Sequence, residues 1–166
     1  EEGKLMGFEL TSLPIEGIVK RNDLIVEVGQ VLSVTGESST INLLYVPSQN
    51  VFGEYSFGYK AIDKEEGRSA IAFVTVNILS VNDVPIAFDL IATTNEDEKV
   101  TILLKGEDVE DTEFNYEIIT GVQHGTLTVI QDERYEYVPT NDYTGLDSFS
   151  YRVVDSGLLS SSIVSV

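Results

Sequence analysis

The chain has 166 residues, with 28 acidic against 10 basic side chains, a formal net charge of −18, one His and no Cys. Without Cys there are no disulfide bonds, thiolate metal sites or Cys nucleophiles, and one His cannot build a multi-His metal centre. The acidic excess argues against nucleic-acid binding, because few basic side chains can replace phosphate counterions. No apolar run approaches the roughly 20 residues of a membrane span, so direct membrane insertion is not expected.

Short segments rich in β-branched and aromatic residues alternate with Gly, Asn, Asp and Pro along the whole chain. Within one of them, Tyr55, Phe57 and Tyr59 alternate with smaller or polar residues, which is typical of a strand with one buried face. No window offers a helical stripe, so we predict an all-β protein. The predicted strands cover residues 24–28, 41–45, 55–61, 70–79, 86–93, 99–104, 114–120, 125–130, 134–138 and 149–153.

An internal repeat divides the chain. Tyr45-Val46-Pro47 recurs 92 residues later as Tyr137-Val138-Pro139, and at the same offset Gly53, Phe57 and Asp63 match Gly145, Phe149 and Asp155. Upstream, Gly17 matches Gly125 at an offset of 108, so the first copy carries about 16 extra residues around 28–40. We therefore predict two homologous domains, residues 1–83 and residues 84–166.

Each predicted domain holds about 80 residues of short strands, a pattern that two sheets packed face to face would satisfy. The fold class expected is all-β, with two tandem β-sandwich domains. The first domain can be read as N-terminally truncated, with the 16-residue insertion. The junction lies near residues 80–85, where Pro85 restricts Val84 to an extended conformation and makes the connection short and stiff.

Several short motifs occur in a fairly specific order: Val76-Asn77-Ile78, Val81 to Pro85, Asn95 to Glu98, Gly106 to Asp111, His124 to Thr128, and Gly145 to Tyr151. Together they resemble cadherin-like repeats of the bacterial Ig-like type found in tandem in large surface adhesins. The resemblance implies two tandem immunoglobulin/cadherin-like β-sandwich domains, a secreted or cell-surface location, neighbouring repeats of the same chain as partners, and calcium that stiffens domain junctions.

Acidic residues occupy five of the seven positions from 107 to 113, and such a cluster repels itself. Calcium, which takes six to eight oxygen ligands from flexible loops, would offset that repulsion. The resemblance implies an interdomain calcium site in which Asp111 replaces or supplements Glu110, and in which Glu54, taken as the counterpart of Asp147, contributes from the first copy. Ser80 and Val84 depart from the linker pattern, which implies fewer ions or weaker binding. The candidate ligands are Asn82, Asp83, Asp108, Glu110, Asp111, Asp155 and Glu54.

An acidic loop can equally be a solvated surface that keeps a protein soluble. Glu96, Glu98 and Asp147 would belong to the opposite end of the second copy, as at most half of another site. His124 has neither a second His nor a Ser nucleophile motif beside it in the sequence, so we expect no catalytic residues and no enzyme.

We therefore expect a calcium-stiffened extracellular spacer or adhesion module in a tandem repeat array. Two alternatives stay open. One is a recognition module that binds a glycan or another surface protein through its loops; its best candidate surface is the insertion, which contains Gly29, Gly36 and Ser38 to Thr40 and forms either an extra hairpin or a binding loop. The other is a calcium-free spacer held by packing alone.

Overall fold

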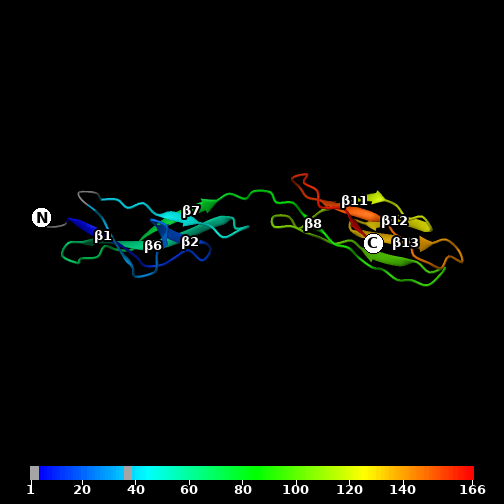
Figure 1. Cartoon of the computed structure of the whole chain (residues 1–166), viewed down its shortest axis with the longest axis horizontal. Coiled ribbons are helices and arrows are strands. Elements are labelled where there is room, and N and C mark those ends of the chain that lie inside the picture. The colour runs from blue at the N-terminus through cyan, green and yellow to red at the C-terminus, as the bar shows by residue number, and fades with distance from the viewer. Residues whose placement is uncertain (1–3, 36–38) are drawn as a thin grey trace. The chain divides into compact units, whose positions relative to one another are not determined.

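The computed structural model describes residues 4–35 and 39–166, and divides the chain into two compact units, Glu1–Ser80 and Val81–Val166 (Figure 1). The described residues form strands and no helix, so the prediction of an all-β fold is confirmed. Nothing in this part of the chain is a helix long and apolar enough to cross a membrane. The division falls three residues before the predicted boundary, so Asn82 and Asp83 belong to unit 2.

Unit 1 consists of two antiparallel sheets around one core. The first sheet has the order β4 (Val31–Ser33), β1 (Leu5–Leu10), β6 (Gly53–Asp63) and β7 (Ala72–Ile78), and the second has the order β3 (Leu24–Ile25), β2 (Ile18–Arg21) and β5 (Leu44–Val46). Alternate residues of these strands face inward, as a half-buried sheet requires. The buried core residues come from both sheets and from the insertion: Leu10, Val19, Val26, Leu32 and Phe57.

Unit 2 repeats this architecture with additional strands. One sheet has the order β12 (Gly125–Gln131), β13 (Arg134–Pro139) and β9 (Val100–Leu103), and another has the order β11 (Asn115–Thr120), β14 (Ser150–Val154) and β15 (Val164–Ser165). A short pair joins β8 (Ile86–Ala87) to β10 (Gly106–Glu107). β14 is buried at Ser150 and Val154 as well as at Tyr151 and Val153, so its burial does not follow the alternation predicted for residues 149–153. The core contains Ile102, Leu104, Tyr135, Phe149, Tyr151 and Val153.

A glycine–tyrosine contact explains why two motifs recur in the sequence. A Cβ atom on Gly17 would lie 2.9 Å from the Tyr45 ring, and one on Gly125 would lie 2.5 Å from the Tyr137 ring. In both units the tyrosine hydroxyl donates to the carbonyl of the residue before the glycine, at 2.7 Å in unit 1 and 3.2 Å in unit 2. Each glycine therefore lets a tyrosine ring cross its backbone and close one corner of the fold.

Three predicted strands have wrong bounds. The strand expected over 86–93 forms a ladder only at Ile86–Ala87, because the Ser165 amide donates to the Asp89 carboxylate instead of to a backbone carbonyl. The strand expected over 24–28 ends at Ile25, and the chain turns soon after, where the Gln30 amide donates to the Glu27 carbonyl at 3.2 Å. The strand expected over 41–45 is β5, shifted to residues 44–46.

The insertion of the first copy contributes an edge strand and core residues. Val31–Ser33 form β4, which pairs antiparallel with β1, and Leu32 is 3% exposed. Gly36 and Ser38, which the sequence placed in a possible loop, lie outside the described residues. The described part of the insertion therefore extends a sheet. Sequence reasoning did not predict the strands β1, β2, β4, β10 and β15.

Candidate functional site at the acidic end of unit 2

Six of the seven predicted calcium ligands lie in unit 2, and hydrogen bonds connect the three segments that carry them. These segments are residues 82–83, where the chain enters the unit, the loop 108–111 after β10, and the turn 155–159 after β14. The sequence separates them by up to about 70 residues, so only the fold brings them together. We call this group the acidic end.

Asp108 holds the first loop in shape. Its Oδ1 atom accepts hydrogen bonds from the backbone amides of Glu110, at 2.9 Å, and Asp111, at 3.1 Å. Its Oδ2 atom is buried and has no hydrogen-bond partner among the described residues. Burying a polar atom without a partner is costly, so such an atom in a folded protein points to a missing partner such as a water molecule or an ion.

Two contacts fasten this loop to its neighbours. The Glu110 carboxylate accepts a hydrogen bond from the Asp83 amide at 3.0 Å. The Asp111 carboxylate accepts from both the amide and the hydroxyl of Ser156, at 2.9 to 3.0 Å. The loop therefore links the entry of the chain to the turn after β14.

Asp155 is the most buried acidic residue of the acidic end, at 1% exposure. Its Oδ1 atom accepts from the Leu159 amide and its Oδ2 atom from the side-chain amide of Asn82, each at 2.8 Å. None of the basic side chains that the structure describes forms an ion pair with it. Buried charges in proteins are normally paired with an opposite charge or bound to a metal, so a cation beside this carboxylate would be favourable.

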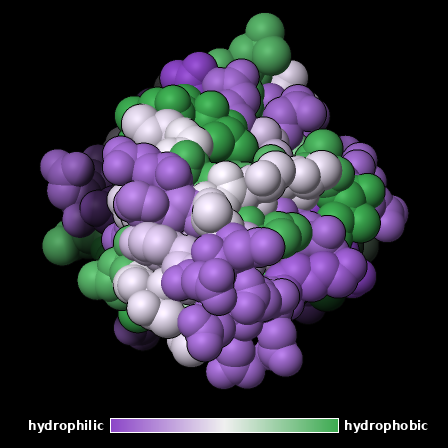
Figure 2. All heavy atoms as spheres, turned by 90° about the vertical axis from the view of Figure 1, so that its right-hand side faces the viewer, coloured by the Kyte–Doolittle hydropathy of each residue, from purple (hydrophilic) through white to green (hydrophobic). Residues whose placement is uncertain are grey.

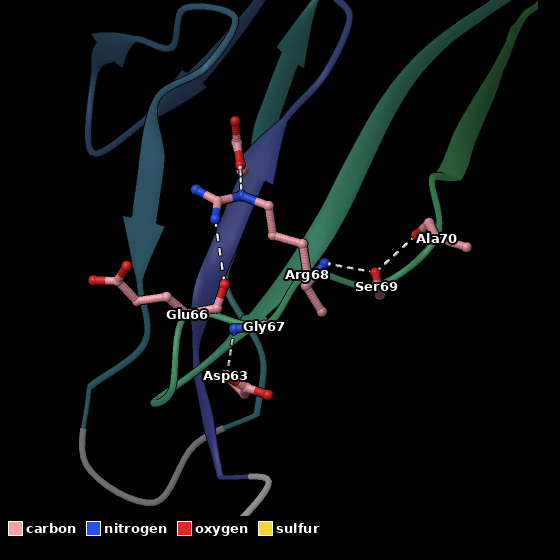
Figure 3. A network of polar contacts seen from close by, with 8 residues as sticks. Asp63, Glu66, Gly67, Arg68, Ser69 and Ala70 are labelled. Carbon is pink, nitrogen blue, oxygen red and sulfur yellow. Dashed lines mark hydrogen bonds and ion pairs between the residues drawn. The ribbon is translucent and has the colours of Figure 1, made fainter.

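The same turn occurs in unit 1, without the surrounding acidic loop. The Asp63 carboxylate accepts from the amide of Gly67 at 2.7 Å (Figure 3). It also accepts from the amide of Glu65 at 2.9 Å. The Asp63 amide donates to the Gly67 carbonyl at 3.0 Å, as the Asp155 amide donates to the Leu159 carbonyl at 3.1 Å. The match of Asp63 with Asp155 therefore has a structural cause, because both carboxylates shape a tight turn.

Glu54, the seventh candidate, lies in unit 1. It lies exposed in β6 of unit 1, where it pairs across the ladder with Asn77. Asp147, taken from the sequence as its counterpart, instead precedes β14 and accepts several hydrogen bonds. The offset of 92 also pairs Asp147 with Tyr55. The equivalence of Glu54 and Asp147 was therefore wrong by one residue.

Asp147 is a structural carboxylate at the other end of unit 2. It accepts from the amides of Gln123, His124 and Ser148 at 2.8 to 2.9 Å and from the Tyr137 hydroxyl at 3.0 Å. Burial alone would raise the pKa of Asp147, but these hydrogen bonds outweigh it and hold the pKa below its ordinary value. Burial, followed by the contact with Asp147, raises the pKa of Tyr137 to about 12. The protein's own donors thus occupy the oxygens of this carboxylate.

His124 packs as a ring rather than as part of a cluster. Its imidazole stacks on the ring of Tyr143, with the ring centroids 4.3 Å apart and the planes 9° from parallel. Its amide and carbonyl hold the loop through the contacts with Asp147 and Tyr137. These contacts give His124 a role in loop packing.

Many carboxylate oxygens of the acidic end already accept hydrogen bonds from backbone amides. Within residues 4–35 and 39–166, no three His, Cys, Asp or Glu side chains are grouped closely enough to hold a metal ion. The oxygen donors nevertheless fit a hard cation such as calcium, and the partnerless Oδ2 atom of Asp108 is available to one. The Asp83 amide donates to one oxygen of the Glu110 carboxylate, which leaves the other Glu110 oxygen and the Asp83 carboxylate outside this contact.

Two packed antiparallel sheets in each unit define an immunoglobulin-like β-sandwich protein. A family model described as "Bacterial Ig domain" matches residues 82–166, just over half of the chain. The chain therefore belongs to the bacterial Ig domain family. Domains of this kind are typically non-catalytic structural modules of extracellular surface proteins.

Two further proteins are similar to the chain. "Integrin beta-like protein B" of Dictyostelium discoideum is 25% identical over 120 residues, which is 72% of this chain but 6% of that protein's length. A solved structure titled "Structures of Clostridium thermocellum CbhA fibronectin(III)-like modules" is 16% identical to this chain. The match covers 93% of this chain and 77% of that one, with a TM-score of 0.28. That score is too low to carry an argument.

Proposed function

We propose that this chain is part of an extracellular array of Ig-like repeats, where it serves as a spacer or adhesion module, and that calcium stiffens the acidic end of unit 2. The family supports the repeat-module role, and the integrin-beta-like relative supports an adhesion setting. The observation that carries the calcium proposal is the buried, partnerless Oδ2 atom of Asp108, in a loop linked to the buried and uncompensated carboxylate of Asp155.

Asp108 and Asp155 would supply the central carboxylates, and Glu110, Asp111 and Asp83 would add oxygens from their loops. A bound divalent cation would remove the mutual repulsion of these carboxylates and supply the missing partner of Asp108. The entry segment at Asn82 and Asp83 is already hydrogen-bonded to Asp155 and Glu110. Calcium would therefore lock the entering chain against unit 2, which is how a small module gains stiffness.

Calorimetric titration of the full chain with calcium, paired with unfolding in calcium and in EDTA, tests this proposal. A single site filled at a hundredfold excess over its dissociation constant should stabilise unit 2 by about 2.7 kcal/mol. Asp108→Asn keeps the Oδ1 atom that accepts from Glu110 and Asp111 but removes the anionic oxygen, so its calcium heat should be lost while its stability in EDTA is retained.

Glu54→Gln is the matched control, because Glu54 is an exposed acidic residue of unit 1 that lies outside the acidic end. It should leave the heat and the stabilisation unchanged. If the unaltered chain gives no saturable heat and unfolds identically in calcium and EDTA, the calcium mechanism is wrong. The chain would then be a spacer held by packing, in which the acidic residues serve solubility.

A further inference from the structure

The two units differ in the segment that links one pair of matching strands. At the offsets of 108 and 92, β2 is the counterpart of β12 and β5 is the counterpart of β13. In unit 1 the segment from β2 to β5 is long and forms β3 and β4. In unit 2 the segment from β12 to β13 is a tight turn, residues 132–133. Unit 2 therefore has nothing in place of β3 and β4.

The long segment of unit 1 covers one edge of each sheet. β3 pairs antiparallel with β2, and β4 pairs antiparallel with β1 in a register that sets Leu32 opposite Phe8. The Val34 amide extends this pairing by donating to the Met6 carbonyl at 3.0 Å. Leu32 is 3% exposed and belongs to the core. One segment thus supplies both an edge strand and a core side chain.

The matching edges of unit 2 are open. The structure describes all of residues 81–166, and in them β11, the counterpart of β1, and β12, the counterpart of β2, are each the last strand of a sheet. Leu10 of β1 is buried, whereas its counterpart Ile118 of β11 is partly exposed. Gly7 is buried, whereas its counterpart Asn115 is exposed. This opening results from the short turn within the unit.

An open groove of about 770 Å³ borders β11. Its lining comes from the segment 112–116 that leads into β11, the segment 103–106 from β9 to β10, the turn 132–133, and residues 155–156 after β14. Tyr116, in this lining, is the counterpart of Phe8, the residue opposite Leu32 in unit 1. The groove therefore borders the position that β4 fills in unit 1.

Free carboxylates make the lining of this groove negative. Glu113, Asp132 and Glu133 line it, and among the described residues none of the three side chains forms an ion pair. Lys105, which also lines the groove, already pairs with Glu107 at 2.8 Å. Charge complementarity at such a surface favours a basic ligand.

We propose that the open edge of β11 accepts an added strand from a separate, basic protein. The strand runs antiparallel to β11, as β4 does to β1, and sets one aliphatic side chain opposite Tyr116. Basic side chains before and after this position pair with Glu113 and with the carboxylates of the turn 132–133. Main-chain hydrogen bonds provide affinity, and the aliphatic and basic positions provide specificity. The proposal is independent of calcium binding.

Net charge decides the source of the strand. Each copy of this chain carries a formal charge of −18, so a strand from a second copy would approach against repulsion. The segment of this chain that would fit, β4, is already paired with β1. A basic protein is attracted to the same carboxylates that repel a second copy. The turn 132–133 therefore disfavours self-association and favours a basic partner.

The groove is suited to a strand, because an unpaired strand edge adjoins the apolar side chains of Leu104, Phe114 and Tyr116. By contrast, the face seen in Figure 2 is largely hydrophilic, with hydrophobic residues in small separate groups. A face of that kind offers no comparable docking surface for a strand.

The first test uses a synthetic peptide that copies residues 29–34, Gly-Gln-Val-Leu-Ser-Val, with lysines added at both ends. The titration into the full chain is made in EDTA, because residues 155–156 also belong to the acidic end. We expect saturable binding in calorimetry and slower hydrogen exchange at the amides of β11. Replacing the lysines with glutamates, or scrambling the six central residues, should weaken binding about tenfold or more.

Methylation of the peptide backbone tests the strand geometry. In unit 1 the Val34 amide faces β1, whereas the Ser33 carbonyl faces away and accepts from the Arg21 guanidinium at 2.7 Å. The amide and carbonyl of one residue in an antiparallel strand point to the same side. Methylating the nitrogen that copies Val34 should therefore weaken binding about tenfold, and methylating the nitrogen that copies Ser33 should leave it unchanged.

Glu133→Lys reverses one charge of the lining and should weaken the peptide about tenfold. Glu96→Lys makes the same change at an exposed residue of unit 2 outside the lining, and at physiological salt it should bind within about twofold of the unaltered chain. The proposal is overturned if the two variants, the two methylated peptides, or the peptide and its scrambled form bind alike. Sedimentation of the chain alone as a dimer with protected β11 amides would also overturn it, because a second copy would then supply the strand.

Discussion

The turns after β6 and β14 are built alike but sit in different surroundings. In both, an aspartate, Asp63 or Asp155, accepts the amide hydrogen bond of the residue four positions later. Unit 2 adds three things: nearly complete burial of Asp155, the side chain of Asn82 on its second oxygen, and the acidic loop that reaches Ser156. The shared feature is therefore the turn, and the calcium hypothesis depends on what unit 2 adds to it.

The two cores differ in completeness in the same way. The segment from β8 to β10 covers Tyr151 in unit 2, while no described segment of unit 1 covers Tyr59. Two sequences with matching motifs thus have cores that are closed to different extents. A matched substitution in each unit should separate what the repeat shares from what one copy adds.

The largest difference is expected between Tyr151→Ala and Tyr59→Ala. Tyr151 is fully buried and hydrogen-bonded, so its truncation should destabilise unit 2 by about 4 kcal/mol. Tyr59 is partly exposed, and we expect a loss of about 1–2 kcal/mol in unit 1. Urea unfolding followed by hydrogen exchange in each unit measures both. Equal losses would show that Tyr59 is as well packed as Tyr151 in solution.

Asp155→Asn and Asp63→Asn should differ in calcium but not in EDTA. Each asparagine keeps an Oδ1 atom for its turn, and the Asn82 amide can flip to face the new side chain. With excess calcium, Asp155→Asn should forfeit most of the roughly 2.7 kcal/mol of ligand stabilisation, whereas Asp63→Asn should forfeit none. Thermal unfolding with and without calcium gives the comparison. A calcium-dependent loss in both variants would place calcium elsewhere.

Gly17→Ala and Gly125→Ala should each destabilise their own unit by about 2 kcal/mol. In both, the new Cβ would lie 2.5 Å from a backbone carbonyl oxygen, which cannot move away as a side chain could. Gly17 also has a φ of +81°, where an L-residue is strained, so its variant should lose more. Denaturant unfolding of each unit checks the order, and a tolerated Gly17→Ala would refute the corner as described.

The smallest effect is expected for Tyr137→Phe, which removes one of the four hydrogen bonds to Asp147. A carboxyl with a lowered pKa stabilises the fold fully above its ordinary pKa of 3.8, and that stability is lost as the pH falls through the folded value. The variant should lose about 1 kcal/mol at neutral pH and begin to unfold at a higher pH in acid titrations.

At alkaline pH the dependence has the opposite sign: stability falls as the pH rises. The neutral Tyr137 hydroxyl, with its pKa raised to about 12, contributes stability that is lost as the pH rises from about 10 through 12. Tyr137→Phe should lack this loss. Unfolding followed between pH 2 and pH 12 tests both limbs, and an unchanged acid midpoint would contradict the role of the hydroxyl.

Alternation and the repeat were enough to predict the all-β fold from the sequence. The strongly patterned strands, such as β6 and β12, were located closely, because each holds five or more residues with a clear inward face. Two-residue strands such as β10 and β15 carry too little pattern to be found. The edge strand β4 was hidden because it is set by pairing with β1, a tertiary contact that has no local signal.

The candidate site was predictable in its membership and not in its geometry. The repeat located Asp155, and the acidic run located Asp108, Glu110 and Asp111. Nothing in the sequence indicated that Asp111 would bond to Ser156, or that one Asp108 oxygen would be buried without a partner. Those contacts depend on how loops far apart in the sequence meet. Glu54 was aligned with Asp147 although the offset of 92 aligns Tyr55 with it, and its role as a ligand stays a prediction.

The most direct test of the calcium-stiffened acidic end is hydrogen exchange measured amide by amide on the full chain, in calcium and in EDTA. The account predicts that calcium slows exchange at the amides of Asp83, Glu110, Asp111, Ser156 and Leu159 by about a hundredfold, the equivalent of about 2.7 kcal/mol. The amides of Glu65 and Gly67, in the matching turn of unit 1, should exchange at the same rate in both conditions. Equal exchange at the acidic end with and without calcium, or equal slowing in both turns, would contradict it.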